Sequence, residues 1–239
     1  MTDETISETE RLDEVRAKLV AAALPHVAFD GWTRATVKAA TGDAGVTEDL
    51  AALAAPRGGV DLAAAFHRHG DREMTAAAEA LDLEALRYSE RVARLVRLRI
   101  EVVGEDREAV RRGATLFSLP IHAAEGARLI WGTADAIWTA LGDTSRDYNW
   151  YTKRAILSGV YSSTVLYWLG DQSPGSESTW AFLDRRIDNV MQFEKTKAKL
   201  KDNKLASALF AGPKAVLSQI KAPASAPGDV PVGFPGRRG

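Results

Sequence analysis

Histidine and carboxylate side chains are the groups in this sequence that could bind a metal ion or transfer protons. The four histidines are His26, His67, His69 and His122, and cysteine is absent. On a helix, His67 and His69 would point to different faces, which makes them poor joint metal ligands. The sequence also lacks a Glu-x-x-His pair, a glycine-rich phosphate loop and a nucleophile elbow. We therefore expect no enzyme activity, no metal and no cofactor.

The composition is that of an ordinary globular chain. Of the 239 residues, 46% are hydrophobic and 26% are charged, and the formal net charge is −1. This is enough apolar material for one large core, and the charge gives no general argument for nucleic acid. The uncharged run from Ala155 to Gly170 has 16 residues, fewer than the roughly 20 that span a bilayer. We expect a soluble chain.

Apolar residues recur at helical spacing along nearly the whole chain, and alternating runs typical of strands are absent. The spacing predicts about nine helices and an all-α fold. Ser173 and Pro174 are suited to cap and begin the last long helix. The predicted helices cover Glu10–Leu24, Thr33–Thr41, Thr47–Ala54, Asp61–Glu79, Leu83–Val103, a stretch before Pro120, Ile121–Leu141, the stretch after Asp147, and a run to about Leu200.

The second and third predicted helices have the spacing of a helix-turn-helix, with the turn at GDAGV. In a DNA-binding protein the helix after this turn presents cations and hydrogen-bond donors to the bases and phosphates. Here it begins with Thr47, Glu48 and Asp49, and it contains no Lys, Arg, Asn or Gln. We interpret the motif as degenerate and expect no nucleic-acid partner.

Large rings and small residues alternate on the helices near Trp131 and Trp168. Such a mixture suits a cavity for an apolar ligand, because rings form broad walls and small residues leave room. It also suits a filled core, and the pattern alone leaves both possibilities open. The candidate lipid-binding residues are Ile130, Trp131, Ala134, Ile137, Trp138, Leu157, Tyr161, Val165, Trp168, Trp180 and Leu183.

The C-terminal part is basic and amphipathic. Between residues 187 and 221 there are seven lysines and three acidic residues. A basic helix with apolar residues on one face is typical of membrane-surface binding, although it could also pack on the body of the protein. The candidate membrane-contacting residues are Lys204, Leu205, Leu209, Phe210, Lys214, Val216, Leu217, Ile220 and Lys221.

The stretch NWYTKRAIL…SPG…TWAFLDRRI resembles the signature region of the Coq-nine family, the lipid-binding accessory proteins of ubiquinone biosynthesis. The earlier stretch FDGWT…AAT…AGV…APRGGVDL is similar to the degenerate helix-turn-helix of that family. The resemblance implies a fold like that of the TetR regulators, usually as a homodimer, in a protein that no longer regulates transcription. A TetR-type regulator that senses an apolar ligand remains the alternative.

The resemblance also implies partners. They are an isoprenoid quinone intermediate or a phospholipid, the di-iron demethoxyubiquinone hydroxylase, and a membrane surface that the C-terminal helix contacts. Paired aromatic rings among charges have the composition of an interface hot spot. We therefore expect an exposed docking patch for the hydroxylase at Asp147, Asn149, Trp150, Tyr151, Lys153 and Arg154, with Trp150 as a cap of the core as the alternative.

Four regions follow from this interpretation. Residues 1–60 form the helix-turn-helix-like region, 61–201 the helical lipid-binding domain, 202–221 the amphipathic helix and 222–239 a disordered tail rich in Pro and Gly. The first residues lack the features of a mitochondrial presequence, and the composition is rich in Ala and Arg. We therefore expect a peripheral protein on the cytoplasmic face of a bacterial inner membrane, in preference to the mitochondrial matrix.

Overall fold

The computed structural model describes residues 7–146 and 148–202. Within these ranges the regular structure consists of nine α-helices and one short 3₁₀ helix, so the predicted all-α fold is confirmed. The helices are α1 (Glu8–Asp30), α2 (Arg34–Asp43), α3 (Glu48–Ala54), α4 (Gly59–Ala78), α5 (Tyr88–Glu101), α6 (Arg107–Ser118), α7 (Ala123–Ala140), α8 (Tyr148–Gly170) and α9 (Glu177–Asp202), and η1 (Pro174–Ser176) precedes α9.

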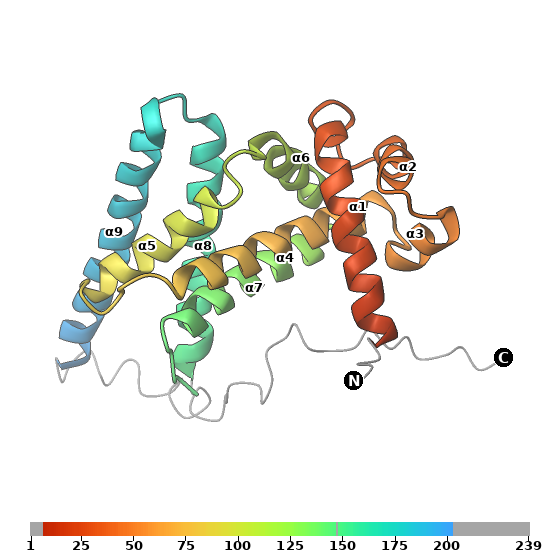
Figure 1. Cartoon of the computed structure of the whole chain (residues 1–239). Coiled ribbons are helices and arrows are strands. Elements are labelled where there is room, and N and C mark those ends of the chain that lie inside the picture. Colours follow the sequence, from red (N-terminus) through yellow and green to blue (C-terminus); the bar gives the residue numbers. More distant parts are fainter. Residues whose placement is uncertain (1–6, 147, 203–239) are drawn as a thin grey trace.

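Two hydrophobic cores lie at opposite ends of the molecule. One core gathers the apolar faces of α1 to α3 with the first half of α4, and Leu19 and Leu62 are fully buried in it. The other core gathers α5, α7, α8 and α9 around Leu95 and Ile137. Figure 1 shows α4 and α7 running between the two ends. Because α4 contributes Leu62 to one core and Met74 to the other, this helix joins the two cores.

The helix-turn-helix arrangement expected near the N-terminus is present. Thr33 caps α2 by accepting a hydrogen bond from the Thr36 amide, and Thr47 caps α3 by accepting one from the Leu50 amide. The turn between these helices passes through Gly45, whose φ of +62° is a conformation that glycine adopts without strain. Both helices pack against α1 (Figure 1).

Two predicted helix boundaries are wrong. The first helix does not end at Pro25 but continues to Asp30. A proline inside a helix removes one backbone hydrogen bond, yet the next turn places Val27 in the buried core, which favours continuation. The fifth helix begins at Tyr88 and not at Leu83, because the preceding residues form turns such as the one closed by the Leu86 amide and the Leu83 carbonyl.

The corner between α8 and α9 is held by the carboxylate of Asp171. This carboxylate accepts hydrogen bonds from the Ser173 amide and from the amide and hydroxyl of Thr179, at 2.6 to 2.9 Å. These bonds hold the pKa of Asp171 well below its ordinary value. Ser173 and Pro174, predicted to cap and begin the last long helix, instead begin η1, and α9 starts at Glu177. In the part of the chain that the structure describes, no helix is long and apolar enough to cross a bilayer.

Candidate ligand-binding cavity

A cavity of about 410 Å³ lies where α4, α5, α6, α7 and α8 meet. Its volume falls within the range of sites that bind small molecules. The walls are mainly apolar side chains from all five helices. They include Phe66 of α4, Ile100 of α5, Phe117 of α6, Ile130 of α7, and Val165 and Trp168 of α8.

Small residues on α6 and α7 shape the space. Gly113 and Ala114 of α6 line the cavity, and so does Gly126 of α7. A methyl group added at Gly126 would lie 2.8 Å from Cβ of Phe117, which is closer than two carbon atoms can pack. Glycine at this position therefore lets α6 approach α7 and close one side of the cavity.

The inner end of the cavity carries a connected set of polar side chains, which we call the polar cluster: His67 and Asp71 of α4, Arg99 of α5, Thr133 of α7 and Tyr161 of α8. Arg99 Nε donates to Asp71 Oδ1 at 2.7 Å, and Arg99 Nη2 donates to the carbonyl of His67 at 2.7 Å. Thr133 Oγ1 donates to Asp71 Oδ1 at 2.7 Å. The Arg99 guanidinium carbon also lies 5.8 Å from the centre of the Tyr161 ring.

The hydrogen bonds determine how His67 is protonated. Its Nε2 lies 2.8 Å from Oγ1 of Thr133, whose single proton is donated to the carboxylate of Asp71. His67 Nε2 must therefore be the donor in its contact with Thr133, which leaves Nδ1 as an acceptor. Burial lowers the pKa of His67 to about 4, so the imidazole is neutral at pH 7. Burial also raises the pKa of the Tyr161 hydroxyl, which stays protonated.

The structure separates the predicted lipid-binding residues into two groups. Four of them line the cavity: Ile130, Tyr161, Val165 and Trp168. The other seven do not line it. Five are buried in the core shared by α5, α7, α8 and α9, namely Ala134, Ile137, Trp138, Leu157 and Leu183. Trp131 packs on Trp150, and the Trp180 ring lies 4.7 Å from the guanidinium of Arg97. The filled-core alternative therefore describes the five core positions, whereas Trp131 and Trp180 are only partly buried.

The sequence did not predict the α6 wall, and of the polar cluster it predicted only Tyr161. Gly113 and Ala114 stand in a helix with no aromatic pattern beyond Phe117, so they carried little signal. His67 and Asp71 are four residues apart, which places them on one face of a helix. Arg99 lies within the stretch 92–100, among the buried apolar residues Val96, Leu98 and Ile100. Together with the spacing of His67 and Asp71, this position could have indicated a buried ion pair.

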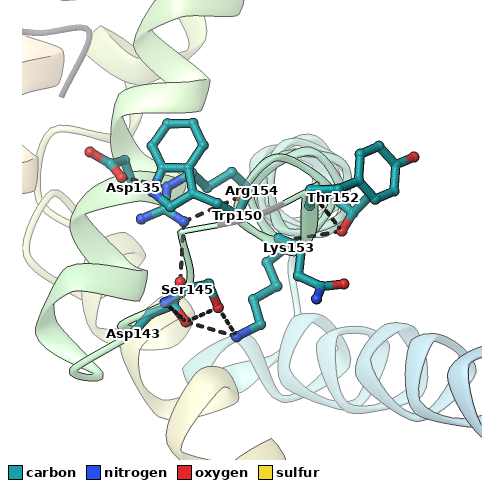
Figure 2. A network of polar contacts seen from close by, with 9 residues as sticks. Asp135, Asp143, Ser145, Trp150, Thr152, Lys153 and Arg154 are labelled. Atoms are coloured by element: carbon teal, nitrogen blue, oxygen red, sulfur yellow. Dashed lines mark hydrogen bonds and ion pairs between the residues drawn. The ribbon is translucent and has the colours of Figure 1, made fainter. Parts of the chain in front are cut away.

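The predicted docking patch at the start of α8 is only partly exposed. Trp150 is 7% exposed, with its ring centre 5.9 Å from that of Trp131 and 4.0 Å from the guanidinium carbon of Arg154. Figure 2 shows Arg154 directed toward Asp135 and Asp143, to which it donates at 2.5 and 3.2 Å.

The expectation that Trp150 and Arg154 are exposed is therefore wrong. The ring covers a buried ion pair, and the two aspartates of α7 and the following turn hold the guanidinium inside. Asn149 is exposed, and Tyr151 and Lys153 are partly exposed. Lys153 donates to Asp143 at 2.7 Å and thereby joins the same network (Figure 2). Asp147 lies outside the described residues, as do the candidate membrane-contacting residues from Lys204 to Lys221.

The helix-turn-helix-like region presents acidic and apolar groups where a DNA-binding protein would present cations. Glu48 and Asp49 of α3 are exposed, and Leu53 of the same helix is 64% exposed. Arg57 follows α3, but its guanidinium forms ion pairs with Asp61 at 2.5 Å and with Glu125 at 2.7 Å. Among the described residues, no three His, Asp or Glu side chains come together as metal ligands.

The arrangement of helices is that of a known class of proteins. A crystal structure of a TetR transcriptional regulator from Nitrosomonas europaea ATCC 19718 aligns with 73% of this chain and 97% of its own, with a TM-score of 0.60. The sequence identity is 21%, so the likeness concerns the fold alone. The chain is an all-α protein with a TetR-like fold.

The sequence comparisons indicate a family within this class. A family model described as COQ9 matches residues 123–194. The chain is also similar to proteins named "Ubiquinone biosynthesis protein COQ9, mitochondrial". It is 30% identical to that of Drosophila melanogaster, 27% to that of Rattus norvegicus and 26% to that of Homo sapiens. These alignments cover 77% to 79% of this chain and 57% to 62% of the relatives' own lengths. Together these similarities support a protein of the COQ9 family.

The relatives also correct one expectation from the sequence. All three carry the designation mitochondrial, whereas we expected a peripheral protein of a bacterial inner membrane, with the mitochondrial matrix less favoured. That expectation is wrong. It depended on composition and on the polar character of the first residues, and neither is a reliable guide to location.

Proposed function

We propose that this chain takes part in ubiquinone biosynthesis as a lipid-binding protein without enzyme activity. In this proposal it binds an isoprenoid quinone intermediate and presents it to the di-iron hydroxylase that acts on demethoxyubiquinone. The observation that supports it most directly is the cavity of about 410 Å³, with apolar walls and a polar inner end. The curated relatives, which are named as ubiquinone biosynthesis proteins, support the pathway.

The physical need for such a protein follows from solubility. Burial of each CH₂ group contributes about 0.8 kcal/mol, so a polyprenyl tail strongly prefers the bilayer to water. A protein that draws the ring of such a lipid out of the membrane must offer apolar surface in return. Phe66, Phe117 and Trp168 provide broad apolar walls of this kind.

Two surfaces belong to the same proposal. The hydroxylase would dock near the start of α8, on Asn149, Tyr151 and Lys153, with Trp150 and Arg154 holding that surface from beneath. The membrane would contact residues 202–221, of which 203–221 lie outside the described part of the chain. Docking is tested by Asn149→Ala and Tyr151→Ala, which should reduce co-purification with the hydroxylase while leaving the melting temperature within a few degrees of wild type.

A homodimer is the third element of the proposal. Leu166 and Tyr167 on α8 are exposed, and the Tyr167 ring stacks on Phe182 of α9 with 4.6 Å between ring centres. Exposed apolar patches of this kind often mark contact surfaces. Light scattering of the purified chain should give twice the monomer mass, and a charged residue in place of Tyr167 should reduce it to the monomer mass.

A transcriptional regulator is the alternative that shares this fold. The exposed carboxylates of Glu48 and Asp49 disfavour it, because they would face the phosphates of DNA. A gel-shift assay with genomic fragments separates the two functions. Binding that weakens steeply with salt would support the regulator, and no shift at low salt would support the proposal made here.

The proposed function can be tested in cells that lack this chain. Such cells should accumulate demethoxyubiquinone, and the wild-type chain should restore ubiquinone. Ala114→Phe, which fills the cavity from α6, should fail to restore it. Ala124→Phe places the same ring on an exposed position of α7 outside the cavity and should restore it fully. Restoration by Ala114→Phe at normal protein levels would contradict the proposal.

A further inference from the structure

The polar cluster is an unexpected feature in a cavity whose other walls are apolar. The Arg99 side chain is 2% exposed, yet it carries a full positive charge, because arginine is not deprotonated in proteins. Burying a charge is unfavourable unless it is paired and hydrogen-bonded. Asp71 supplies the opposite charge, and the carbonyl of His67 supplies a second acceptor. The cavity could have been closed with apolar residues, so the cluster calls for a functional explanation.

The members of the cluster form two layers. His67, Arg99 and Tyr161 line the cavity, whereas Asp71 and Thr133 lie behind them. Asp71 accepts from both Arg99 and Thr133, so the second layer orients the first. The remaining guanidinium nitrogen of Arg99, Nη1, lies against Gly70 of α4, where an added Cβ would clash with it. The inner end thus lines the cavity with the Tyr161 hydroxyl and the Arg99 guanidinium as possible donors, whereas His67, whose Nε2–H is donated to Thr133, can only accept through Nδ1.

The charge of the cluster indicates which chemical group it can receive. Asp71 already balances Arg99, and burial keeps His67 and Tyr161 neutral. A phosphate or carboxylate would therefore bring an unpaired negative charge into a buried site, which is unfavourable. A neutral oxygen that accepts hydrogen bonds, such as a quinone carbonyl or a phenol, introduces no such charge.

The two ends of the cavity differ in their exposure to solvent. Its inner end is formed by buried residues such as Arg99 and Ile100, whereas its other end is formed by exposed ones, among them Ser118, Ala127 and Leu166, of which Leu166 is 66% exposed. A volume of about 410 Å³ is near the lower limit for drug-sized ligands. It accommodates one substituted ring and a short length of tail, so a long tail has to leave through the exposed end.

We propose that Arg99 and Tyr161 form a recognition site for a ring oxygen of the ligand, a quinone carbonyl or a phenol, and that His67, which can only accept, contributes a hydrogen bond only when this oxygen is a phenol. The ring lies inward against the polar cluster, and the isoprenoid tail leaves past Leu166. This inference rests on the proposed function, because it assumes that the cavity binds a lipid of this class. It adds the orientation of the ligand, the residues that select it, and the rejection of phosphate head groups at this end.

The test compares two ligands that share a ten-carbon tail and differ in the ring, one with ring oxygens and one without. One is a dimethoxy-methyl-benzoquinone with a ten-carbon tail, and the other is decylbenzene. Binding of each to the full chain is measured by calorimetry at pH 7. We expect wild type to bind the quinone at least tenfold more tightly. Tyr161→Phe removes only a hydroxyl group and should reduce this preference at least threefold.

A second variant removes the charges without leaving one of them unpaired. Asp71→Leu combined with Arg99→Met should abolish the preference while changing decylbenzene affinity less than twofold. Val165→Ala, on the apolar wall, should weaken both ligands equally. Equal affinity of wild type for both ligands, or a preference kept by Tyr161→Phe and by the double variant, would overturn the assignment and leave the proposed function intact. Failure of wild type to bind either ligand would contradict the proposed function itself.

Discussion

Arg99 of α5 donates a hydrogen bond from Nε to Oδ1 of Asp71 on α4 across 2.7 Å, beneath the floor of the cavity. Arg99 is almost completely buried and Asp71 is largely buried. A pair of this kind costs desolvation free energy, and it persists here because each partner has further hydrogen bonds, to the His67 carbonyl and to Thr133. The pair joins α4, α5 and α7 at the end of the cavity where the ligand ring is proposed to lie.

The first prediction concerns this ion pair. Asp71→Leu alone leaves the Arg99 charge buried and unpaired, so it should lower the free energy of unfolding by about 3–5 kcal/mol. The double variant Asp71→Leu/Arg99→Met removes both charges and should recover most of that loss. Urea unfolding measures both. A double variant as unstable as the single one would show that packing, and not charge pairing, dominates at this position.

The second prediction compares two glycines on α7. Gly126→Ala brings a methyl group against Phe117, so it should cost about 1–3 kcal/mol of stability and reduce ligand binding by pushing α6 away. Gly132→Ala meets no atom within 4 Å and should stabilise the helix by up to about 1 kcal/mol. Thermal unfolding and ligand titration of the two variants provide the comparison. Equal effects would contradict the close approach of α6 to α7.

The third prediction concerns pH. The pKa of His67 is about 4 in the folded chain and about 6.5 when unfolded, so the unfolded state binds more protons between these values. Stability should therefore rise as the pH increases from 4 to 6.5, by on the order of 2–3 kcal/mol, and then level off. Asp71 and Arg99 face the imidazole and partly offset each other.

Other groups also titrate in this range, so the wild-type curve must be compared with a matched variant. His67→Gln keeps a polar side chain but cannot take up the proton. Its stability should change less than that of wild type between pH 4 and 6.5. Identical pH profiles in urea unfolding would indicate that the His67 pKa is not lowered by burial.

The fourth prediction concerns the start of α8. Trp150 covers the Arg154 ion pairs, so Trp150→Ala should lower the free energy of unfolding by about 3–5 kcal/mol. Tyr148→Ala, at an exposed ring two residues earlier, should change it by less than about 0.5 kcal/mol. If Trp150→Ala were as stable as wild type and lost only hydroxylase binding, the ring would be a docking residue, as the sequence first suggested.

The sequence predicted most of the helices correctly. It did not predict how the helices pack, and it predicted only some of the residues that line the cavity. Helical periodicity is a local signal, and it predicted the element order and the helix-turn-helix arrangement, with helices beginning near Thr33 and Thr47. The continuation of α1 past Pro25 depends on the tertiary burial of Val27, which has no local signal.

The cavity illustrates the same limit. Trp138 and Trp168 look equivalent in the sequence, but Trp138 is packed in the core and only Trp168 faces the cavity. Which ring lines a space depends on how α6 approaches α7, and that distance depends on Gly126. The exposure of Trp150 was mispredicted for a related reason, because its partners Trp131 and Arg154 come together only when α7 and α8 pack side by side.

The central claim is that the cavity between α4 and α8 holds an isoprenoid quinone. Mass spectrometry of organic extracts from gently purified protein tests it most directly, with Ala114→Phe and Ala124→Phe purified in parallel. We predict quinone intermediates in extracts of wild type and Ala124→Phe, and their loss from Ala114→Phe at an unchanged melting temperature. Extracts of wild type that hold no quinone, or equal amounts of quinone in Ala114→Phe, would contradict the claim.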